Sequence, residues 1–177
     1  SDLKLAYGPA IDKGFYYDLM TPTPIKEEDF PKIEKRMKEI IKEDRPFTRI
    51  DVSAEEGLKR TEGDKYKRDN AERALAREES DGTLSFYCSG KPGENWEDLC
   101  AGPHVPSTGK LKAFKILSLA GAYWHGDQNS DQLTRVYGTC FADKEGLESY
   151  LTFLEEAKKR DHRRIGKEMD LYHIEDH

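Results

Sequence analysis

The sequence has few cysteines, no long apolar run and no excess of positive charge. Its three cysteines, Cys88, Cys100 and Cys140, make no paired framework, so we expect a reducing compartment and a cytoplasmic protein. No segment approaches the ~18 apolar residues that span a membrane, and no signal peptide opens the chain, so we expect no membrane association. The net charge of −6 argues against a broadly basic nucleic-acid binder, although it leaves room for local basic clusters.

The remaining composition suits one domain, or one domain with an appendage. The chain has 177 residues, of which 36% are hydrophobic, and this is enough for a core inside a heavily charged exterior. It has no initiator Met and opens directly in the strand-like segment LKLAYGPAI. We therefore expect a piece of a larger protein.

Alternating and turn-rich segments predict several strands. The turn residues within YGPAIDKGFYYDL predict two short strands around a turn. PFTRIDV and TLSFYC are further strand candidates. KAFKILSLAGAYW and TRVYGTCFA are joined by the turn-rich HGDQNSDQ, so we expect them to form a hairpin.

Helices are expected between and after these strands. A one-sided apolar stripe predicts a helix from Phe30 to Ile41. Ser53 and Glu56 form a capping-box pattern for a short helix, and residues 64–79 are typical of a more polar one. The mixture indicates an α+β fold, with an antiparallel sheet and helices packed on one side.

A long C-terminal helix should follow this sheet. Asp143 is a good N-cap, and an apolar stripe continues after it. The far half, KKRDHRRIGKEMD, is nearly all charged and has little apolar face to bury. We expect residues 1–142 to form a domain and residues 143–177 to form a connector helix that leads elsewhere.

The segment EDLCAGPHVPSTG places Cys100 and His104 four residues apart across a Gly-Pro corner. A zinc site needs three or four ligands, and this pair supplies two. A Cys-His nucleophile pair needs an orienting group, which Asp98 could supply. The third reading is a small buried cysteine beside a histidine that bonds within its loop. The spacing alone leaves the three alternatives open.

The sequence segments around Cys100 and His104 resemble those of a known family. DLCAGPHVPSTG, AGAYWHGD, LTRVYGT and EEAKKRDHRRIGKEMDLY occur in this order and, with YGPAIDKGFYYD near the start, resemble bacterial-type threonyl-tRNA synthetases. The resemblance implies that residues 1–142 are the editing domain without its N-terminal part. It also implies that residues 143–177 lead toward a class II catalytic core outside this chain. The domain is similar to the editing domain of alanyl-tRNA synthetase.

The resemblance further implies an editing site made of an H-x-x-x-H motif together with the Cys and His of CxGPH. Here Cys100 and His104 match the second half, and the first half would lie upstream of Ser1. The resemblance also points to Asp98 and to Lys67 in GDKYK as catalytic residues. It favours a polarising or shape-setting role for Cys100 over a nucleophilic one. We therefore expect the isolated chain to be inactive in editing.

The resemblance implies no cofactor and no metal for this chain, because ATP, Mg²⁺ and zinc belong to the absent core. The alanyl relatives hold zinc in a comparable site, whereas the threonyl family resembles a metal-free version. The implied partners are the acceptor end of tRNA(Thr), the remaining domains of the synthetase and, for the full enzyme, a second copy. Candidate contacts to the tRNA backbone are the charged connector and three lysines, Lys110, Lys112 and Lys115.

Two other functions remain open from the sequence. One is a free-standing hydrolase that clears mischarged tRNA, although its charged connector would then have no domain to reach. The other is a non-catalytic module that binds tRNA or dimerises, against which the net acidity argues.

Overall fold

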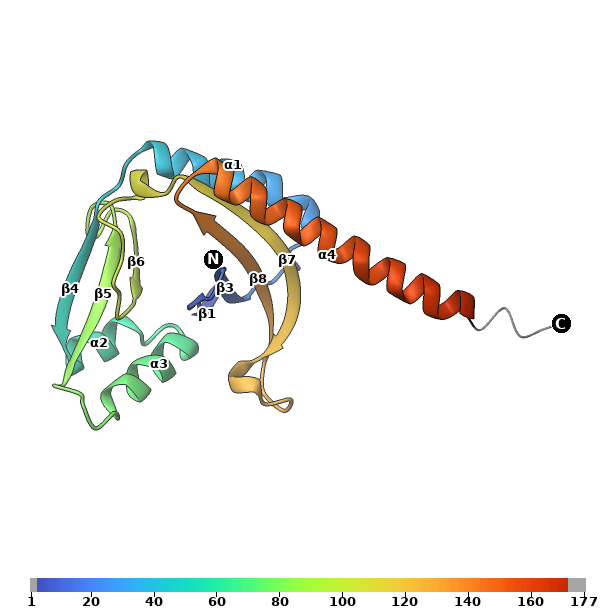
Figure 1. Cartoon of the computed structure of the whole chain (residues 1–177). Helices are drawn as coiled ribbons and strands as arrows, with labels where there is room; N and C mark the ends of the chain where they lie inside the picture. Colours follow the sequence, from blue (N-terminus) through green and yellow to red (C-terminus); the bar gives the residue numbers. More distant parts are fainter. Residues whose placement is uncertain (1–2, 172–177) are drawn as a thin grey trace.

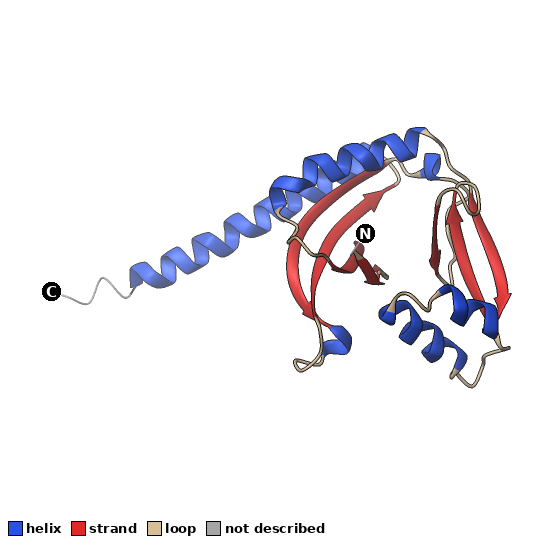
Figure 2. Cartoon of the chain, turned by 180° about the vertical axis from the view of Figure 1, so that it is seen from behind, coloured by secondary structure: helices blue, strands red, loops and turns tan. Residues whose placement is uncertain are grey.

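The structure, a computed structural model, describes the backbone of residues 3–171 and the side chains of residues 3–160. Its strands form two separate antiparallel sheets (Figures 1 and 2). The elements are β1 (Lys4–Tyr7), β2 (Ala10–Ile11), β3 (Gly14–Met20), η1 (Glu27–Asp29), α1 (Phe30–Lys42), β4 (Phe47–Ser53), α2 (Ala54–Arg60), α3 (Lys65–Leu75), β5 (Thr83–Ser89), β6 (Trp96–Leu99), η2 (Thr108–Lys110), β7 (Ala113–Tyr123), η3 (Trp124–Gly126), β8 (Gln132–Phe141) and α4 (Lys144–Leu171).

The large sheet has the order β1-β3-β8-β7, and β2 pairs with β3. β7 and β8 form the predicted hairpin, which bends strongly (Figure 1) and shifts register between Ile116 and Ser118. Helix α1 lies across this sheet and buries Phe30 against Ile116 and Val136. The apolar stripe of α1 is therefore a core contact, as its period of about 3.6 residues predicts.

The small sheet has the order β4-β5-β6 and is covered by α2 and α3 (Figure 2). Leu84 and Phe86 of β5 pack with Ala71 of α3 in a buried cluster. Gly57 of α2 lies so close to this cluster that a Cβ atom there would be 2.5 Å from Leu84 Cδ1. Ser53 caps α2 by accepting a hydrogen bond from the backbone N–H of Glu56, which confirms the predicted start of that helix.

Helix α3 contacts both sheets. Tyr66 is 1% exposed and packs with Ala6 of β1 and Leu133 of β8. Its ring also meets Trp124 edge-on at a centroid distance of 4.9 Å. One face of α3 therefore belongs to the core of the small sheet, and a neighbouring face belongs to the large sheet.

Helix α4 begins beside the large sheet and then projects away from it (Figures 1 and 2). Asp143 caps it, because its carboxylate accepts the backbone N–H of Gly146 at 2.8 Å. Tyr150 packs on Phe141 of β8, with ring centroids 5.3 Å apart. The helix thus has the start that the sequence predicts, whereas the last six residues of the expected connector, 172–177, lie outside the described part. The division at position 142 stays a prediction.

The α+β class with antiparallel strands and a long C-terminal helix is confirmed. The sequence did not predict that the strands divide between two sheets, each with its own helices. It also did not predict β6, a four-residue strand just before the Cys-Gly-Pro-His loop. Between residues 3 and 171, no helix combines the length and the apolar character needed to cross a membrane.

Candidate functional site

Strand β6 and the loop after it carry the residues that the sequence singled out. Asp98 lies on β6 opposite Tyr87 of β5. Cys100 directly follows the strand, and its backbone stays attached to β5. Its N–H donates to the carbonyl of Ser85 at 3.0 Å, and the Ser85 hydroxyl donates to its carbonyl at 2.7 Å. Ser85 thereby binds both backbone polar groups of Cys100.

The far end of the same loop is anchored near the end of α1. Thr108 is 3% exposed; its hydroxyl donates to the Ile40 carbonyl at 2.8 Å and accepts the Arg45 N–H at 2.9 Å. The Asp44 carboxylate accepts hydrogen bonds from the Ser107 hydroxyl and from a backbone N–H of η2, and the Ser107 bond is the main cause of a lowered pKa at Asp44. The loop is therefore attached at both ends to regular structure.

Within this loop, Cys100 and His104 face each other. The Cys100 sulfur lies 3.2 Å from His104 Nε2 and accepts the backbone N–H of Gly102 at 3.3 Å. The imidazole stacks on the Phe47 ring at a centroid distance of 4.9 Å and is tilted against Tyr87 at 4.4 Å. Partial burial lowers the pKa of His104 below its ordinary value, which favours the neutral ring at pH 7.

A second group of polar residues lies where three elements meet. Lys67 of α3 places its ammonium 2.6 Å from the carboxylate of Asp98 on β6. The Tyr17 hydroxyl of β3 donates to the same carboxylate at 2.7 Å and lies 3.2 Å from the Lys67 nitrogen. The Lys67 and Asp98 side chains are only 12% and 11% exposed, so this is a largely buried ion pair.

The two groups occupy one neighbourhood. Burial raises the pKa of Tyr17 far above its ordinary value, and the Asp98 carboxylate and the Cys100 thiol add to the rise. Tyr17 therefore stays protonated and acts as a hydrogen-bond donor. The structure thus brings together all four predicted residues: Lys67, Asp98, Cys100 and His104.

Sequence reasoning missed Tyr17. It lies in YGPAIDKGFYYD, a segment quoted for its resemblance, but nothing in that segment distinguishes Tyr17 from Tyr16 beside it. The Tyr16 ring instead lies against the Arg135 guanidinium at 3.9 Å, outside the predicted site. Only the partners that β3 reaches through folding identify Tyr17.

The lysines predicted to contact tRNA behave differently from one another. Lys115 pairs with Glu34 of α1 at 3.0 Å, so its charge is already used within the fold. Lys110 and Lys112 are exposed beside the anchored loop and contribute to the lowered pKa of Asp44. These two remain candidates for contacts with a phosphate backbone.

The described residues contain no cluster of three or more His, Cys, Asp or Glu side chains that could hold a metal ion. Cys100 and His104 supply two donors, and zinc sites in proteins use three or four. The present side chains alone therefore do not fit a zinc ion.

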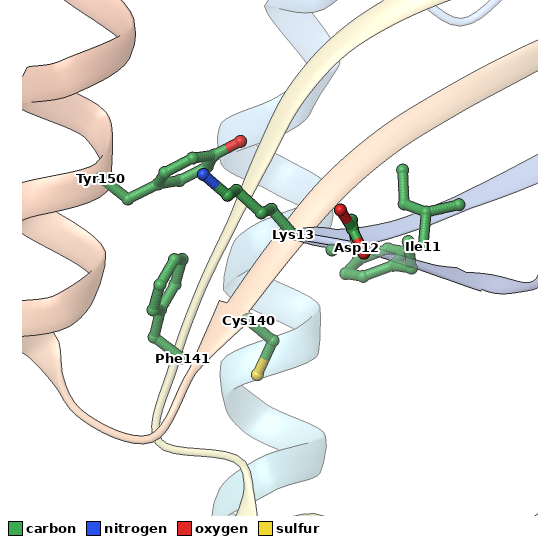
Figure 3. Close-up of a pocket in the computed structure, with 8 residues that line it drawn as sticks. Ile11, Asp12, Lys13, Cys140, Phe141 and Tyr150 are labelled. Carbon is green, nitrogen blue, oxygen red and sulfur yellow. The ribbon is translucent and has the colours of Figure 1, made fainter.

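A cavity of about 420 Å³ lies apart from these residues, between the β2–β3 turn, the end of β8 and α4 (Figure 3). Lys13 extends along it, with its ammonium 5.9 Å from the Tyr150 ring centroid and 5.7 Å from that of Phe153. Cys140 and Phe141 contribute to its wall. None of the four predicted site residues lines the cavity, which lies beside the start of α4.

Comparison with known proteins shows which proteins this chain is similar to. Residues 85–137 match the family model described as the second additional domain of threonyl and alanyl tRNA synthetases. The threonine–tRNA ligases of Burkholderia lata, Burkholderia ambifaria and Burkholderia multivorans are 48%, 49% and 50% identical to the chain in alignments that cover 99% of it. The chain is homologous to threonine–tRNA ligase.

The homology covers one part of the longer ligases, since the chain spans 27% of the length of these relatives. The matched domain includes Asp98, Cys100 and His104, whereas Lys67 and Tyr17 lie before it. The site therefore combines residues of the family domain with residues from the preceding α3 and β3.

We predict that the isolated chain holds no stoichiometric zinc. Two ligands leave little affinity over water, because a stable zinc site needs three or four. The measurement is metal analysis after zinc loading, mild chelation and dialysis, with the Cys100→Ala variant as the baseline. One tightly held zinc ion per chain would contradict the prediction.

We also predict that Asp98→Asn lowers the free energy of unfolding by about 3 kcal/mol, because it leaves the Lys67 charge buried and unpaired. The matched control is Asp51→Asn. Its ion pair with Arg49 is 54% and 52% exposed on the two sides, so we expect a loss below about 1 kcal/mol. Urea denaturation of both variants measures the difference, and equal losses would show that the buried pair contributes nothing special.

Proposed function

We propose that this chain is the editing portion of a threonine–tRNA ligase. In the complete enzyme it hydrolyses the ester that joins serine to tRNA(Thr). The observation that carries the proposal is the convergence of Lys67, Asp98, Cys100 and His104 in a domain homologous to the synthetase family. Aminoacylation, with its ATP, Mg²⁺ and zinc, belongs in this proposal to a core outside the chain.

Editing answers a physical limit on substrate selection. Threonine and serine differ by one methyl group, and such a difference is worth only ~1–3 kcal/mol of discrimination, or about 10–200-fold. An aminoacylation site therefore attaches some serine to the tRNA, and a second site has to hydrolyse this mischarged product. Ester hydrolysis needs a group that orients water, a group that stabilises the oxyanion, and a pocket too tight for the threonine methyl.

The residues of the site can share these roles. The neutral imidazole of His104 can orient water or a ribose hydroxyl through hydrogen bonds. The Lys67 ammonium can offset the negative charge that develops on the ester, while Asp98 and Tyr17 hold it in place. We assign Cys100 a polarising or shape-setting role, since it directly borders the imidazole.

The tRNA would approach the site across the anchored loop. Lys110 and Lys112 are exposed there and suit contacts to phosphates of the acceptor end. In this proposal α4 connects the domain to the rest of the synthetase, which acts as a homodimer. The alternatives are a free-standing deacylase and a non-catalytic tRNA-binding module. The last of these gives no reason for a buried ion pair beside a Cys-His pair.

We predict that the chain alone deacylates seryl-tRNA(Thr) far more slowly than a version extended upstream to include an H-x-x-x-H motif. General acid–base positioning is worth ~10²–10⁴-fold in rate, and the H-x-x-x-H motif that the family resemblance implies should supply it. The measurement is single-turnover deacylation by both proteins at equal concentration. Comparable rates would mean that the described residues suffice.

We predict that Cys100→Ala in the complete enzyme strongly reduces hydrolysis of seryl-tRNA(Thr) and leaves threonine charging nearly unchanged. The two activities should be separable because this site lies outside the proposed aminoacylation core. Removing one sulfur is a modest packing change, so the fold should survive. Two assays on one mutant are needed: the threonylation rate and the accumulation of seryl-tRNA(Thr).

A parallel fall of both activities at unchanged thermal stability would contradict the separation of the two sites. If neither activity changed, Cys100 would be a structural cysteine. A suitable control is Cys140→Ala, since Cys140 is an exposed cysteine on the wall of the separate cavity.

A further inference from the structure

The imidazole of His104 contacts two aromatic rings, although the residue as a whole is exposed. Phe47 covers one face at an interplanar angle of 23°, and Tyr87 lies against the ring at 42°. Nε2 points to the Cys100 sulfur at 3.2 Å. Because these contacts use the faces of the ring and one nitrogen, the edge that carries Nδ1 is left for solvent or a ligand.

The hydrogen bonds around the sulfur decide where the imidazole proton lies. The Gly102 N–H already donates to the Cys100 sulfur at 3.3 Å. If Nε2 also carried a proton, the sulfur would accept two hydrogen bonds and its own S–H would point away from both. If the thiol donates to Nε2 instead, every group in the contact is satisfied. A neutral imidazole has one N–H, which then lies on Nδ1.

Phe47 and Tyr87, which together we call the aromatic clamp, lie on strands β4 and β5 of the small sheet. Tyr87 is 9% exposed. Its hydroxyl oxygen lies so close to Gly102 that a Cβ atom on this glycine would be 2.3 Å from it. Gly102 has a φ of +73°, a conformation that favours glycine. At the other ring, the Phe47 N–H donates to the Pro106 carbonyl at 3.0 Å. The Phe47 backbone and the Tyr87 ring are thus both held close to the loop that carries His104.

We propose that Phe47 and Tyr87 are positioning residues that hold His104 as a neutral ring protonated on Nδ1, with this N–H presented to an oxygen atom of the substrate. The identity of the substrate rests on the proposed function, whereas the state of the ring does not. Burial lowers the pKa of His104, in agreement with a neutral ring. The titratable groups that face the ring are the Cys100 thiol and the Tyr87 hydroxyl.

The tautomer can be read directly by nitrogen NMR of the isolated, metal-free chain at about pH 8, above the ordinary histidine pKa of about 6.5. Long-range ¹H–¹⁵N spectra distinguish a protonated from an unprotonated ring nitrogen, and the His104→Gln variant assigns the His104 signals by their loss. We expect Nδ1 to be protonated and Nε2 unprotonated. A predominant Nε2–H form would overturn the proposal.

The same spectrum contains an internal reference of the opposite kind. His125 Nε2 lies 2.7 Å from the Asp69 carboxylate, which can only accept a hydrogen bond when ionised. Its neutral ring should therefore carry the proton on Nε2. Finding His104 and His125 in opposite tautomers supports the proposal, and finding both as Nε2–H contradicts it.

Variants separate the clamp from a general effect on stability. Cys100→Ser keeps a donor for Nε2 and should keep the tautomer, whereas Cys100→Ala should return the ring to a mixture. Phe47→Ala should raise the His104 pKa toward about 6.5 by admitting water, and Phe47→Tyr should restore the lower value. The matched control is Phe153→Ala, which removes a 51% exposed ring on α4 and should leave the pKa unchanged. An unchanged pKa in Phe47→Ala would remove Phe47 from the clamp.

A functional arm tests the use of the Nδ1–H. In the complete enzyme, His104→Asn places an amide near the position of Nδ1, and His104→Gln places one near Nε2. We expect the Asn variant to keep at least tenfold more deacylation of seryl-tRNA(Thr) than the Gln variant. Equal or reversed rates contradict the donor role of Nδ1. If the unmodified complete enzyme does not deacylate this tRNA, the proposed function fails while the NMR result on the ring still stands.

Discussion

The ion pair between Lys67 of α3 and Asp98 of β6 lies where these two elements meet β3. Tyr17 of β3 donates a hydrogen bond to the same carboxylate. A charge buried without its partner costs several kcal/mol, so neither side chain can leave this point without the other. The pair therefore ties the small sheet to the large one through α3. The same side chains supply the charge for the proposed ester hydrolysis, and the geometry of the site depends on the packing of the two sheets.

Local sequence patterns predicted the elements that local physics determines. The stripe of α1, the cap at Ser53 and the β7–β8 hairpin each depend on residues close together in the chain, and all three are present. Strand β6 was not predicted, because WEDL is short and has no β-branched residue. Its pairing with β5 comes from the folded chain. The division into two sheets also arises only in the folded chain. The strands of both sheets have similar sequence patterns, so the patterns do not indicate which strands pair.

The candidate site shows the same limit more sharply. Cys100 and His104 were visible because they are four residues apart, and family resemblance indicated Asp98 and Lys67. Tyr17 is 81 residues from Asp98 and 50 from Lys67, so no spacing rule could join them. Phe47 and Tyr87 resemble ordinary strand aromatics in sequence. Only their distances to His104 separate them from the other rings of the sheet.

The base of α4 has a mechanical consequence. The helix has 28 residues and, at about 1.5 Å per residue, is ~42 Å long. Within residues 144–160, whose side chains the structure describes, its contacts with the domain lie near the start, around Phe141, Tyr150 and Lys13. A tilt of about 5° at this end displaces the other by roughly 4 Å over such a length. The cavity of Figure 3 lies beside this end of α4. A substitution that enlarges or fills the cavity and thereby tilts the helix slightly would therefore displace the far end of α4 by several times more than the near end.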